Sequence, residues 1–431
     1  MLILSHPTGN ANVRETARAL NEAGLLSEFW TSIYWRQEST LNRVLPKTLV
    51  HELNRRAFSH VSSDQVHSNP WRETGRLIST RLGLSKLNQH ETGFFSVDAV
   101  YHSMDRKLAM ALHRNSDVRG VYAYEDGALN TFQAARARGL KTIYELPIGY
   151  WRAHRELLNE EAALQPEWAN TLRGKTDSQE KLHRKDEELA LADQIIVPSQ
   201  FVRNTLAKAG PLSLSASINI ISYGAPPVTF EPKSVAENTK LKVIFVGMLS
   251  QRKGLSYLLD AVKKLGSCVE LTLIGRRAGN CKPLDKALQE HRWISSLSHD
   301  EVLQEIRRHD VMVFPSLFEG FGLVVLEAMS RGVPVIATPQ GGAPDFLVDG
   351  EDGFLVPIRN SEAIAEKLEI LIRDRNRLFS MSQAATRKAI HHSWKSYRQH
   401  LVQTVQQTMA QDTPTGLKVV WSTDLQTCNQ C

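Results

Sequence analysis

Glu319 and Glu327 stand eight positions apart in a glycine-containing segment, and both carboxylates can accept hydrogen bonds. Glu319 lies in a loop with Gly320 and Gly322, directly before residues that favour a helix. A glycine-rich loop that leads into a helix directs free backbone N–H groups at an anion such as a phosphate. A carboxylate beside a phosphate is repelled unless it has another partner, and sugar hydroxyls can donate hydrogen bonds to it. A sugar nucleotide therefore fits this segment better than a bare nucleotide.

The elements around these glutamates follow the order strand, loop, helix, strand. The apolar run 311–314 predicts a buried strand. A helix is expected from about residue 323 to residue 330, closed by Gly332 and Pro334. The apolar run 335–337 predicts a second buried strand. This order is typical of a Rossmann-like α/β domain with a parallel sheet.

The segment FEGFGLVVLEAMSRGVPVIAT, residues 318–338, closely resembles the signature of the family-four, or group 1, retaining glycosyltransferases. Other landmarks of that family follow in the expected order, among them ADQIIVPSQFVRNTL at residues 192–206. The resemblance implies an α/β protein of GT-B architecture, in which two Rossmann-like domains with parallel sheets face each other across a cleft. It is clear over about residues 190–410 and only topological over residues 1–190.

The resemblance also implies a donor site. Glu319 would accept hydrogen bonds from the hydroxyls of the donor sugar, and Glu327 from those of the ribose. Lys253 matches the family lysine that contacts the donor diphosphate. In the family, the first loop of the chain also approaches the donor, and Gly9 is the position where a backbone could come that close. The expected donor-binding residues are Gly9, Arg252, Lys253, Glu319, Gly320, Phe321, Gly322, Leu323 and Glu327, of which Glu319 and Lys253 are catalytic.

Two positions depart from the family pattern. Met248 stands where an arginine is common, so either Arg252 takes over that contact or the contact is missing. The strand that ends in ELPIGYWRAH carries Glu145 and has no histidine before His154, although many family members place one at this strand end. Residues 293–299 are the candidate pocket for the base, without a pattern that distinguishes uracil from guanine.

Alternating strands and helices predict two domains in this chain of 431 residues. Residues 1–225 are expected to form the acceptor domain, and residues 241–390 the donor-binding domain. The polar stretch 226–240 is expected to link them. By its resemblance to GT-B proteins, the segment 391–410 is a terminal helix that crosses back to the first domain, and residues 411–431 form a mobile tail.

The formal net charge of +6 is shared evenly between the two halves of the chain, so a nucleic-acid footprint is not indicated. Cys428 and Cys431 lack a second pair at zinc-ligand spacing, which favours reduced thiols in a loose tail over a metal site. No apolar run is long enough to span a bilayer, and the first residues have no signal-peptide pattern. The expected location is the cytoplasm, either free or in peripheral contact with the inner face of the membrane.

A membrane contact would involve residues 45–58, LPKTLVHELNRRAF. Leu45, Leu49, Leu53 and Phe58 approach helical spacing, and basic residues lie among them. A basic amphipathic helix at this place could meet a membrane surface or an acceptor. A helix that packs on the core and has one solvated face explains the same pattern.

These observations predict transfer of a hexose from a nucleoside-diphosphate sugar to a hydroxyl acceptor, with retention at the anomeric carbon. The acceptor would be a glycan, a lipid-linked sugar or a small molecule. No Asp-x-Asp motif stands at a strand end, so no metal and no cofactor are expected besides the nucleotide-sugar donor. Two alternatives stay open, a sugar-nucleotide epimerase on the same fold and a non-catalytic protein that binds sugar nucleotides. Met248 and the missing histidine prompt the second alternative.

Overall fold

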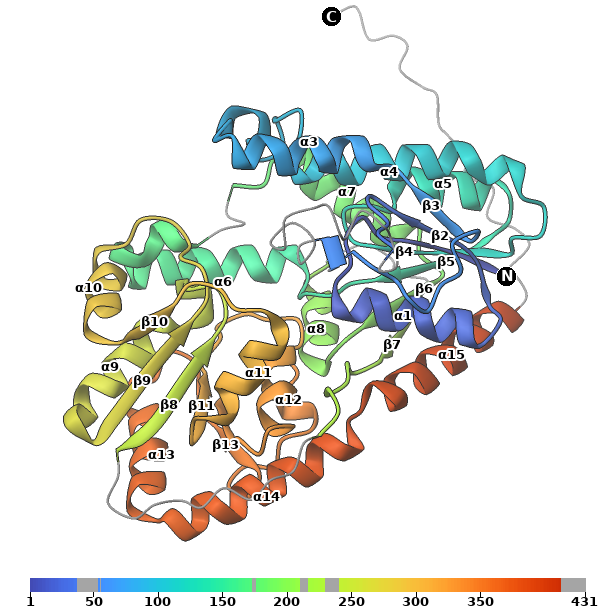
Figure 1. Ribbon diagram of the computed structural model, residues 1–431. Coiled ribbons are helices and arrows are strands. Elements are labelled where there is room, and N and C mark those ends of the chain that lie inside the picture. The colour runs from blue at the N-terminus through green and yellow to red at the C-terminus, as the bar shows by residue number, and fades with distance from the viewer. Residues whose placement is uncertain (37–52, 55, 173–175, 210–215, 229–239, 412–431) are drawn as a thin grey trace, which may run out of the picture.

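The computed structural model describes residues 1–36, 53–54, 56–172, 176–209, 216–228 and 240–411. They form an α/β fold with two parallel sheets that are covered by helices (Figure 1). No helix within these ranges has the length and apolar content needed to span a bilayer. Most of the basic stretch 45–58 and of the expected linker 226–240 lies outside the described residues, as do Cys428 and Cys431.

The first sheet has the strand order β3-β2-β1-β4-β5-β6-β7, and all neighbouring pairs are parallel. Strands β1 and β4 are buried along their whole length, which explains their apolar sequences LILS and GVYAY. The strands are β1 (Leu2–Ser5), β2 (Leu26–Thr31), β3 (Val66–Ser68), β4 (Gly120–Tyr124), β5 (Lys141–Glu145), β6 (Gln194–Val197) and β7 (Ser217–Ile220).

The second sheet has the strand order β10-β9-β8-β11-β12-β13, again with parallel neighbours. The predicted buried strands 311–314 and 335–337 are β11 and β12, and they pair with Val313 opposite Ile336. The strands are β8 (Leu241–Val246), β9 (Val269–Ile274), β10 (Arg292–Ile294), β11 (Val311–Phe314), β12 (Val335–Ala337) and β13 (Gly353–Leu355).

The two sheets share one strand order, because the first sheet differs from the second only by the additional strand β7. In each sheet the order reverses once, between β1 and β4 in the first and between β8 and β11 in the second. Ligands of open parallel sheets bind outside the carboxyl ends of the strands at such a reversal. The loops after these four strands are therefore the places where a ligand is expected.

Local sequence signals set the ends of several helices. Ser199 is the N-cap of α8, and its hydroxyl accepts a hydrogen bond from the Val202 amide. Ser298 and Glu301 form a capping box at α11. The longer helices are α1 (Ala11–Glu22), α3 (Pro70–Arg81), α4 (Val97–Ala111), α5 (Leu129–Ala137), α6 (Trp151–Leu164), α7 (Gln179–Ala190), α8 (Gln200–Thr205), α9 (Leu255–Leu265), α10 (Lys282–Glu290), α11 (His299–Arg307), α12 (Leu323–Met329), α13 (Ser361–Arg373), α14 (Arg375–His391) and α15 (Trp394–Ala410).

Helix α6 packs on the second half of the molecule, although its sequence lies in the first. Figure 1 shows α6 extending from the first sheet toward α10 and β10. Glu161 on α6 accepts a hydrogen bond from Gln251 at 2.7 Å and pairs with Arg359 at 2.7 Å. Trp168, in the turn after α6, is buried in the core of the second half. Glu161 and Trp168, which lie within the expected domain 1–225, therefore pack against the second half, and the bounds of that domain stay a prediction.

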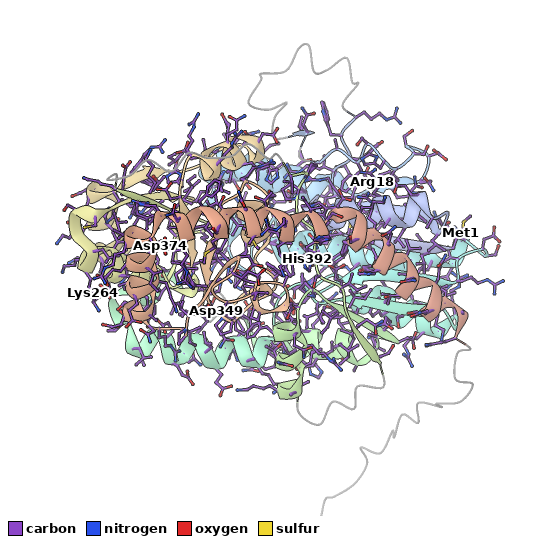
Figure 2. The ribbon with its side chains drawn as sticks, turned by 90° about the horizontal axis from the view of Figure 1, so that it is seen from below. Met1, Arg18, Lys264, Asp349, Asp374 and His392 are labelled. Carbon is purple, nitrogen blue, oxygen red and sulfur yellow. The ribbon has the colours of Figure 1, made fainter. Side chains whose placement is uncertain are left out.

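Helix α15 makes the converse contact, because it follows the second sheet in the sequence and packs on the first half of the molecule. Figure 2 shows α14 and α15 running from Asp374 past His392 to the first half of the molecule, near Arg18. Tyr397 on α15 forms a hydrogen bond of 2.7 Å with Thr16 on α1, and both side chains are buried. One helical segment of each half of the molecule therefore packs against the other half.

Candidate active site

A cavity of about 410 Å³ opens where residues from the carboxyl ends of both sheets meet. From the first half, the lining residues are His6, Asn10, Asn12, Tyr124, Pro147 and Tyr223. From the second half, they are Val246, Gly247, Lys253, Phe314, Glu319, Gly320, Phe321, Gly322, Leu323, Val324 and Glu327. Of the predicted donor-binding residues, Gly9 and Arg252 are not in this lining and the other seven are.

Lys253 and Glu319 form an ion pair in the cavity wall. Lys253 ends the short helix η6 (Gln251–Lys253), and its ammonium lies 4.8 Å from the centre of the Phe314 ring. The two charged side chains are only 11% and 14% exposed, so little water screens the pair. Burial and the Arg252 guanidinium lower the pKa of Lys253, whereas the Glu319 carboxylate acts in the opposite direction. The wall thus holds a cation for a phosphate next to a carboxylate for sugar hydroxyls.

Gly254 allows the Lys253 turn to meet the loop that carries Glu319. Its backbone is left-handed, with a φ of +68°. A Cβ atom at this position would lie 1.9 Å from the carbonyl oxygen of Pro315. A residue with a side chain would therefore push the two loops apart and separate Lys253 from Glu319.

Arg252 lies beside Glu319 and outside the cavity lining. Its guanidinium donates a hydrogen bond to the carbonyl of Phe318 and lies 3.5 Å from the Glu319 carboxylate. Burial lowers the pKa of Arg252 to about 10, which leaves it charged at neutral pH. Met248, at the position of the common family arginine, is 44% exposed and does not line the cavity either. Arg252 therefore orients the Glu319 loop, and its contact with a donor stays a prediction.

The loop 315–322 touches the first half of the molecule through its backbone. A Cβ atom at Gly320 would lie 1.8 Å from the carbonyl oxygen of Pro147. The Ser199 hydroxyl donates a hydrogen bond of 2.6 Å to the Gly320 carbonyl. Glycine is therefore required at position 320, because any side chain would move the loop away from the first half.

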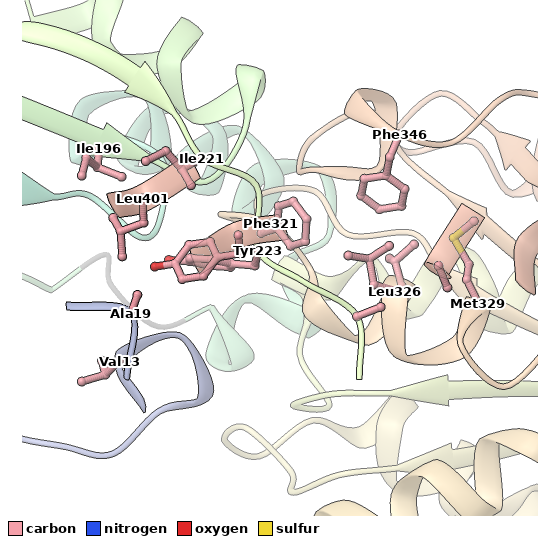
Figure 3. Close-up of a cluster of buried hydrophobic side chains, with 14 of the residues drawn as sticks. Val13, Ala19, Ile196, Ile221, Tyr223, Phe321, Leu326, Met329, Phe346 and Leu401 are labelled. Atoms are coloured by element: carbon pink, nitrogen blue, oxygen red, sulfur yellow. The ribbon is translucent and has the colours of Figure 1, made fainter. Parts of the chain in front are cut away.

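Aromatic rings complete the contact between the halves. Figure 3 shows Tyr223 beside Phe321, and their ring centres are 5.4 Å apart. Gly322 follows with a left-handed φ of +83°, and a Cβ atom there would lie 2.8 Å from the Phe314 ring. Leu323 then begins α12 at the cavity wall. The turn at Gly322 thus brings the start of α12 next to Glu319 in the same lining.

Glu327 lies further along α12 and lines the same cavity. Its side chain is 18% exposed, and His299 lies 3.8 Å from the carboxylate. Burial raises the pKa of Glu327, while His299 and Arg331 act in the opposite direction. Trp293 and His299, the ends of the predicted base segment, are not in the lining. The contact of His299 nevertheless places that segment next to Glu327.

His6 is a lining residue that was not among the predicted site residues. It follows β1, at the reversal of strand order in the first sheet, which is the signal that could have identified it. Its Nδ1 lies 2.6 Å from the carbonyl oxygen and 3.0 Å from the amide nitrogen of Thr8, so Nε2 is the nitrogen left for a ligand. Burial lowers the pKa of His6 to about 4, and the ring is neutral at pH 7. Gly9 lies in the same loop, but Asn10 is the residue that lines the cavity.

Glu145, at the strand end where many family members place a histidine, is fully buried behind the cavity wall. It accepts hydrogen bonds from Tyr122, from Tyr223 at 2.7 Å and from Asn12 at 3.3 Å. Burial raises the pKa of Glu145, and these hydrogen bonds oppose the rise. Because Asn12 and Tyr223 line the cavity, Glu145 positions two lining side chains without being in the lining itself. His154 lies outside this lining as well.

Comparison with known proteins shows what the second half of the chain is similar to. Residues 228–388 match the model of the family "Glycosyl transferases group 1", which confirms the resemblance inferred from residues 318–338. D-inositol 3-phosphate glycosyltransferase of Corynebacterium urealyticum is 29% identical over 254 residues, which is 51% of this chain and 60% of that protein. Sulfoquinovosyl transferase SQD2 of Arabidopsis thaliana is 29% identical over 220 residues, or 48% of this chain and 42% of that protein. These matches therefore span about half the length of each relative.

Solved structures resemble nearly the whole chain. Sucrose-phosphate synthase from Thermosynechococcus elongatus superposes with a TM-score of 0.64 at 17% identity, covering 95% of this chain and 99% of that one. HepE of Anabaena, in complex with UDP-glucose, superposes with a TM-score of 0.59 at 17% identity, covering 94% and 99%. At this identity the likeness establishes the fold, so the expected GT-B architecture is confirmed.

Proposed function

We propose that this chain, similar over its second half to the group 1 glycosyltransferases, transfers a hexose from a nucleoside-diphosphate sugar to a hydroxyl acceptor, with retention at the anomeric carbon. The observation that carries the proposal is the Lys253–Glu319 pair in the wall of the cavity between the two sheets. HepE of Anabaena, which has the same fold, was solved with UDP-glucose, and this supports a nucleotide sugar as the donor.

Donor binding would give both members of the pair a new partner. Lys253 and Glu319 neutralise each other in the structure. A diphosphate carries more negative charge than a carboxylate and would attract the lysine, while sugar hydroxyls would donate hydrogen bonds to Glu319. The exchange replaces one buried ion pair by two sets of contacts to the donor. This suits a site that must be filled by a sugar and a diphosphate together.

The reaction breaks the bond between the anomeric carbon and the diphosphate oxygen. Negative charge grows on the departing diphosphate, and Lys253 with the backbone N–H groups of residues 320–323 would stabilise it. The acceptor oxygen forms the new bond to the anomeric carbon, and its proton leaves to the diphosphate or to solvent. Glu319 would hold the ring in place during this exchange.

Activity is expected to survive EDTA, because Lys253 and backbone N–H groups supply the positive partners that a divalent ion supplies in other transferases. In the described part of the chain, His90, Glu91 and Asp177 form a group that could hold a metal, but they do not line the cavity. The measurement is donor turnover after dialysis against EDTA, with and without added manganese or magnesium. Activity that EDTA abolishes and manganese restores would contradict this expectation.

We infer that Nε2 of His6 donates or accepts a hydrogen bond with the donor sugar. His6→Ala is then expected to lower kcat/KM about tenfold, because the loss of that hydrogen bond costs about 1.4 kcal/mol. His6→Asn, which retains a hydrogen-bonding group, should lose less. His154→Ala is the matched control, since this histidine lies outside the lining of the donor cavity. A larger loss of kcat/KM in His154→Ala than in His6→Ala would show that the wrong histidine has been chosen.

The proposed function is tested by calorimetric titration with UDP-, GDP- and ADP-sugars, followed by incubation of the tightest donor with trial acceptors. Release of the nucleoside diphosphate, with a product that keeps the anomeric configuration of the donor, supports the proposal. Conversion of the donor to its epimer without nucleotide release would identify an epimerase. Tight binding of a nucleotide sugar without any hydrolysis or transfer would identify a non-catalytic binding protein.

A further inference from the structure

Helix α3 turns its apolar side chains outward and its acidic side chain inward. Trp71, Ile78 and Leu82 are seven and four positions apart, so they lie on one stripe of the helix and its C-terminal end. All three are exposed, Ile78 to 51%. Glu73 lies on the opposite face, is 2% exposed and pairs with Arg76 at 2.7 Å. A surface helix that merely covers a core shows the reverse pattern.

The exposed apolar surface continues beyond α3. Each residue from 81 to 87, the sequence RLGLSKL, is exposed. Of the fifteen exposed large apolar side chains in the described ranges, eight fall within about a tenth of the chain. These eight are Trp71, Ile78, Leu82, Leu84, Leu87, Phe94, Val97 and Met110. We call the exposed parts of residues 70–110, which carry these side chains, the α3–α4 surface.

Aromatic rings and an arginine are packed together on the α3–α4 surface. The guanidinium of Arg72 lies 4.5 Å from the centre of the Trp71 ring and 4.6 Å from that of Phe94. The rings of Trp71 and Phe94 meet edge-on with centres 5.5 Å apart. Tryptophan and arginine combine an apolar body with a polar part, and such side chains favour the boundary between water and lipid.

The charge exposed on this surface is almost entirely positive. Its acidic side chains are held by partners: Glu73 by Arg76, Asp98 by Lys181, Asp105 by Arg184, and Glu91 by the backbone N–H of Ser178. Lys86, Arg106 and Lys107 are exposed. Arg106 has no ion pair with any residue in the described ranges. If a second copy bound here in a two-fold symmetric contact, the cations of the two copies would face and repel each other. The charge of the surface therefore favours an anionic partner.

A groove of about 430 Å³ lies at the Trp71 end of the α3–α4 surface. Trp71 and Met110 form apolar parts of its wall, and Arg106 and Lys107 provide two cations. Ser103 adds a hydroxyl to the same lining. Apolar walls next to cations and a hydroxyl match the chemistry of a phospholipid, whose phosphate adjoins its acyl chains.

We propose that the α3–α4 surface docks on an anionic lipid bilayer. Leu82, Leu84 and Phe94 enter the interfacial layer, and Lys86 and Arg106 face lipid phosphates. Figure 1 shows α3 and α4 along the upper edge of the molecule, away from α15. The proposal assigns the membrane contact to residues 70–110 and does not use the basic stretch 45–58. It does not depend on the proposed transferase activity.

The test is co-sedimentation with vesicles of phosphatidylcholine alone and of phosphatidylcholine mixed with phosphatidylglycerol. The full chain is expected to bind the mixed vesicles, less so as salt rises. The double variant Leu82→Ser/Leu84→Ser should bind at least about tenfold more weakly, because two leucines no longer enter the lipid. Lys86→Glu/Arg106→Glu should also lose at least about tenfold, by reversal of two charges at the surface.

Phe379→Ser/Ile390→Ser on α14 is the matched control, because these two apolar side chains are also exposed. It should bind vesicles as the unchanged chain does. All six positions are exposed, so melting followed by circular dichroism should confirm that each variant is folded. Failure of the unchanged chain to bind mixed vesicles would overturn the proposal, as would an equal loss in the α14 control. Light scattering that shows a dimer abolished by Leu82→Ser/Leu84→Ser would assign the surface to self-association and overturn it too.

Discussion

Lys253→Ala is expected to lower the turnover number roughly 100-fold. The lysine cation stabilises the departing diphosphate in a site that excludes water, and such a contact lowers the activation free energy by about 3 kcal/mol. Lys253 is placed for this task by η6 and by Gly254, and it lines the cavity beside Glu319. The measurement is kcat for donor hydrolysis or transfer at saturating donor. Lys253→Arg keeps the charge on a differently shaped group and should lose less than Lys253→Ala.

The same substitution is also expected to lower the free energy of unfolding by about 2 kcal/mol, because the buried Glu319 carboxylate then keeps only the Arg252 guanidinium, 3.5 Å away, as a cationic partner. Lys253→Ala/Glu319→Ala removes both charges and should recover stability without recovering turnover. Lys264→Ala is the control, since Lys264 pairs with Glu362 at the exposed surface and should change neither quantity. Near-normal turnover in folded Lys253→Ala would remove Lys253 from the mechanism.

The elements around the site that the sequence predicted correctly, two strands and the helix between them, lie within one short segment. Strands β11 and β12 were expected from their apolar runs, and the helix between them from its flanking glycines. Glu319 and Glu327 line one cavity because a single strand–loop–helix unit carries both. The order of the elements in this unit follows from local sequence signals, whereas the position of its loop also depends on hydrogen bonds from Arg252 and Ser199.

Contacts between distant residues were not predictable in the same way. The hydrogen bond from Ser199 to Gly320 joins residues 121 positions apart, and Arg359 reaches Glu161 across 198 positions. The second contact is one of those that place α6 on the second half of the molecule. No periodicity within α6 reveals which sheet it covers, because the covering residues lie elsewhere in the chain.

Helix α3 shows a second limit of sequence patterns. The spacing of Trp71, Ile78 and Leu82 reveals an apolar stripe, but the stripe alone does not say whether it faces a core or the exterior. In the structure, the face of α3 that carries Glu73 is the buried one, and Arg56 and Arg76 pair with its carboxylate. The apolar stripe therefore faces the exterior. An apolar stripe is therefore evidence for a core only after the partners of the opposite face are known.

Glu319→Ala and Glu327→Ala are expected to fail in different ways. Glu319→Ala should lower turnover by roughly 100-fold, because a carboxylate that holds the sugar ring contributes up to about 3 kcal/mol. Its affinity for the nucleoside diphosphate alone should stay equal or rise, since Lys253 is then free of its carboxylate partner. Glu327→Ala should weaken that affinity about tenfold. The contact between Glu327 and the ribose is expected to be equally strong in the bound state and in the transition state, so its loss affects binding rather than turnover.

The structure gives a reason for this difference in the positions of the two carboxylates. Glu319 precedes α12 and forms an ion pair with Lys253. Glu327 lies on α12, about 6 Å along the helix axis from its first residue, Leu323, because each residue of an α-helix adds 1.5 Å. Titration calorimetry with the nucleoside diphosphate alone separates the variants, with exposed Glu290→Ala as the control. Equal loss of affinity in both variants would contradict the assignment of Glu319 to the donor sugar and Glu327 to the ribose. Opposite changes of affinity could not come from general damage to the fold, because partial unfolding would weaken binding in both.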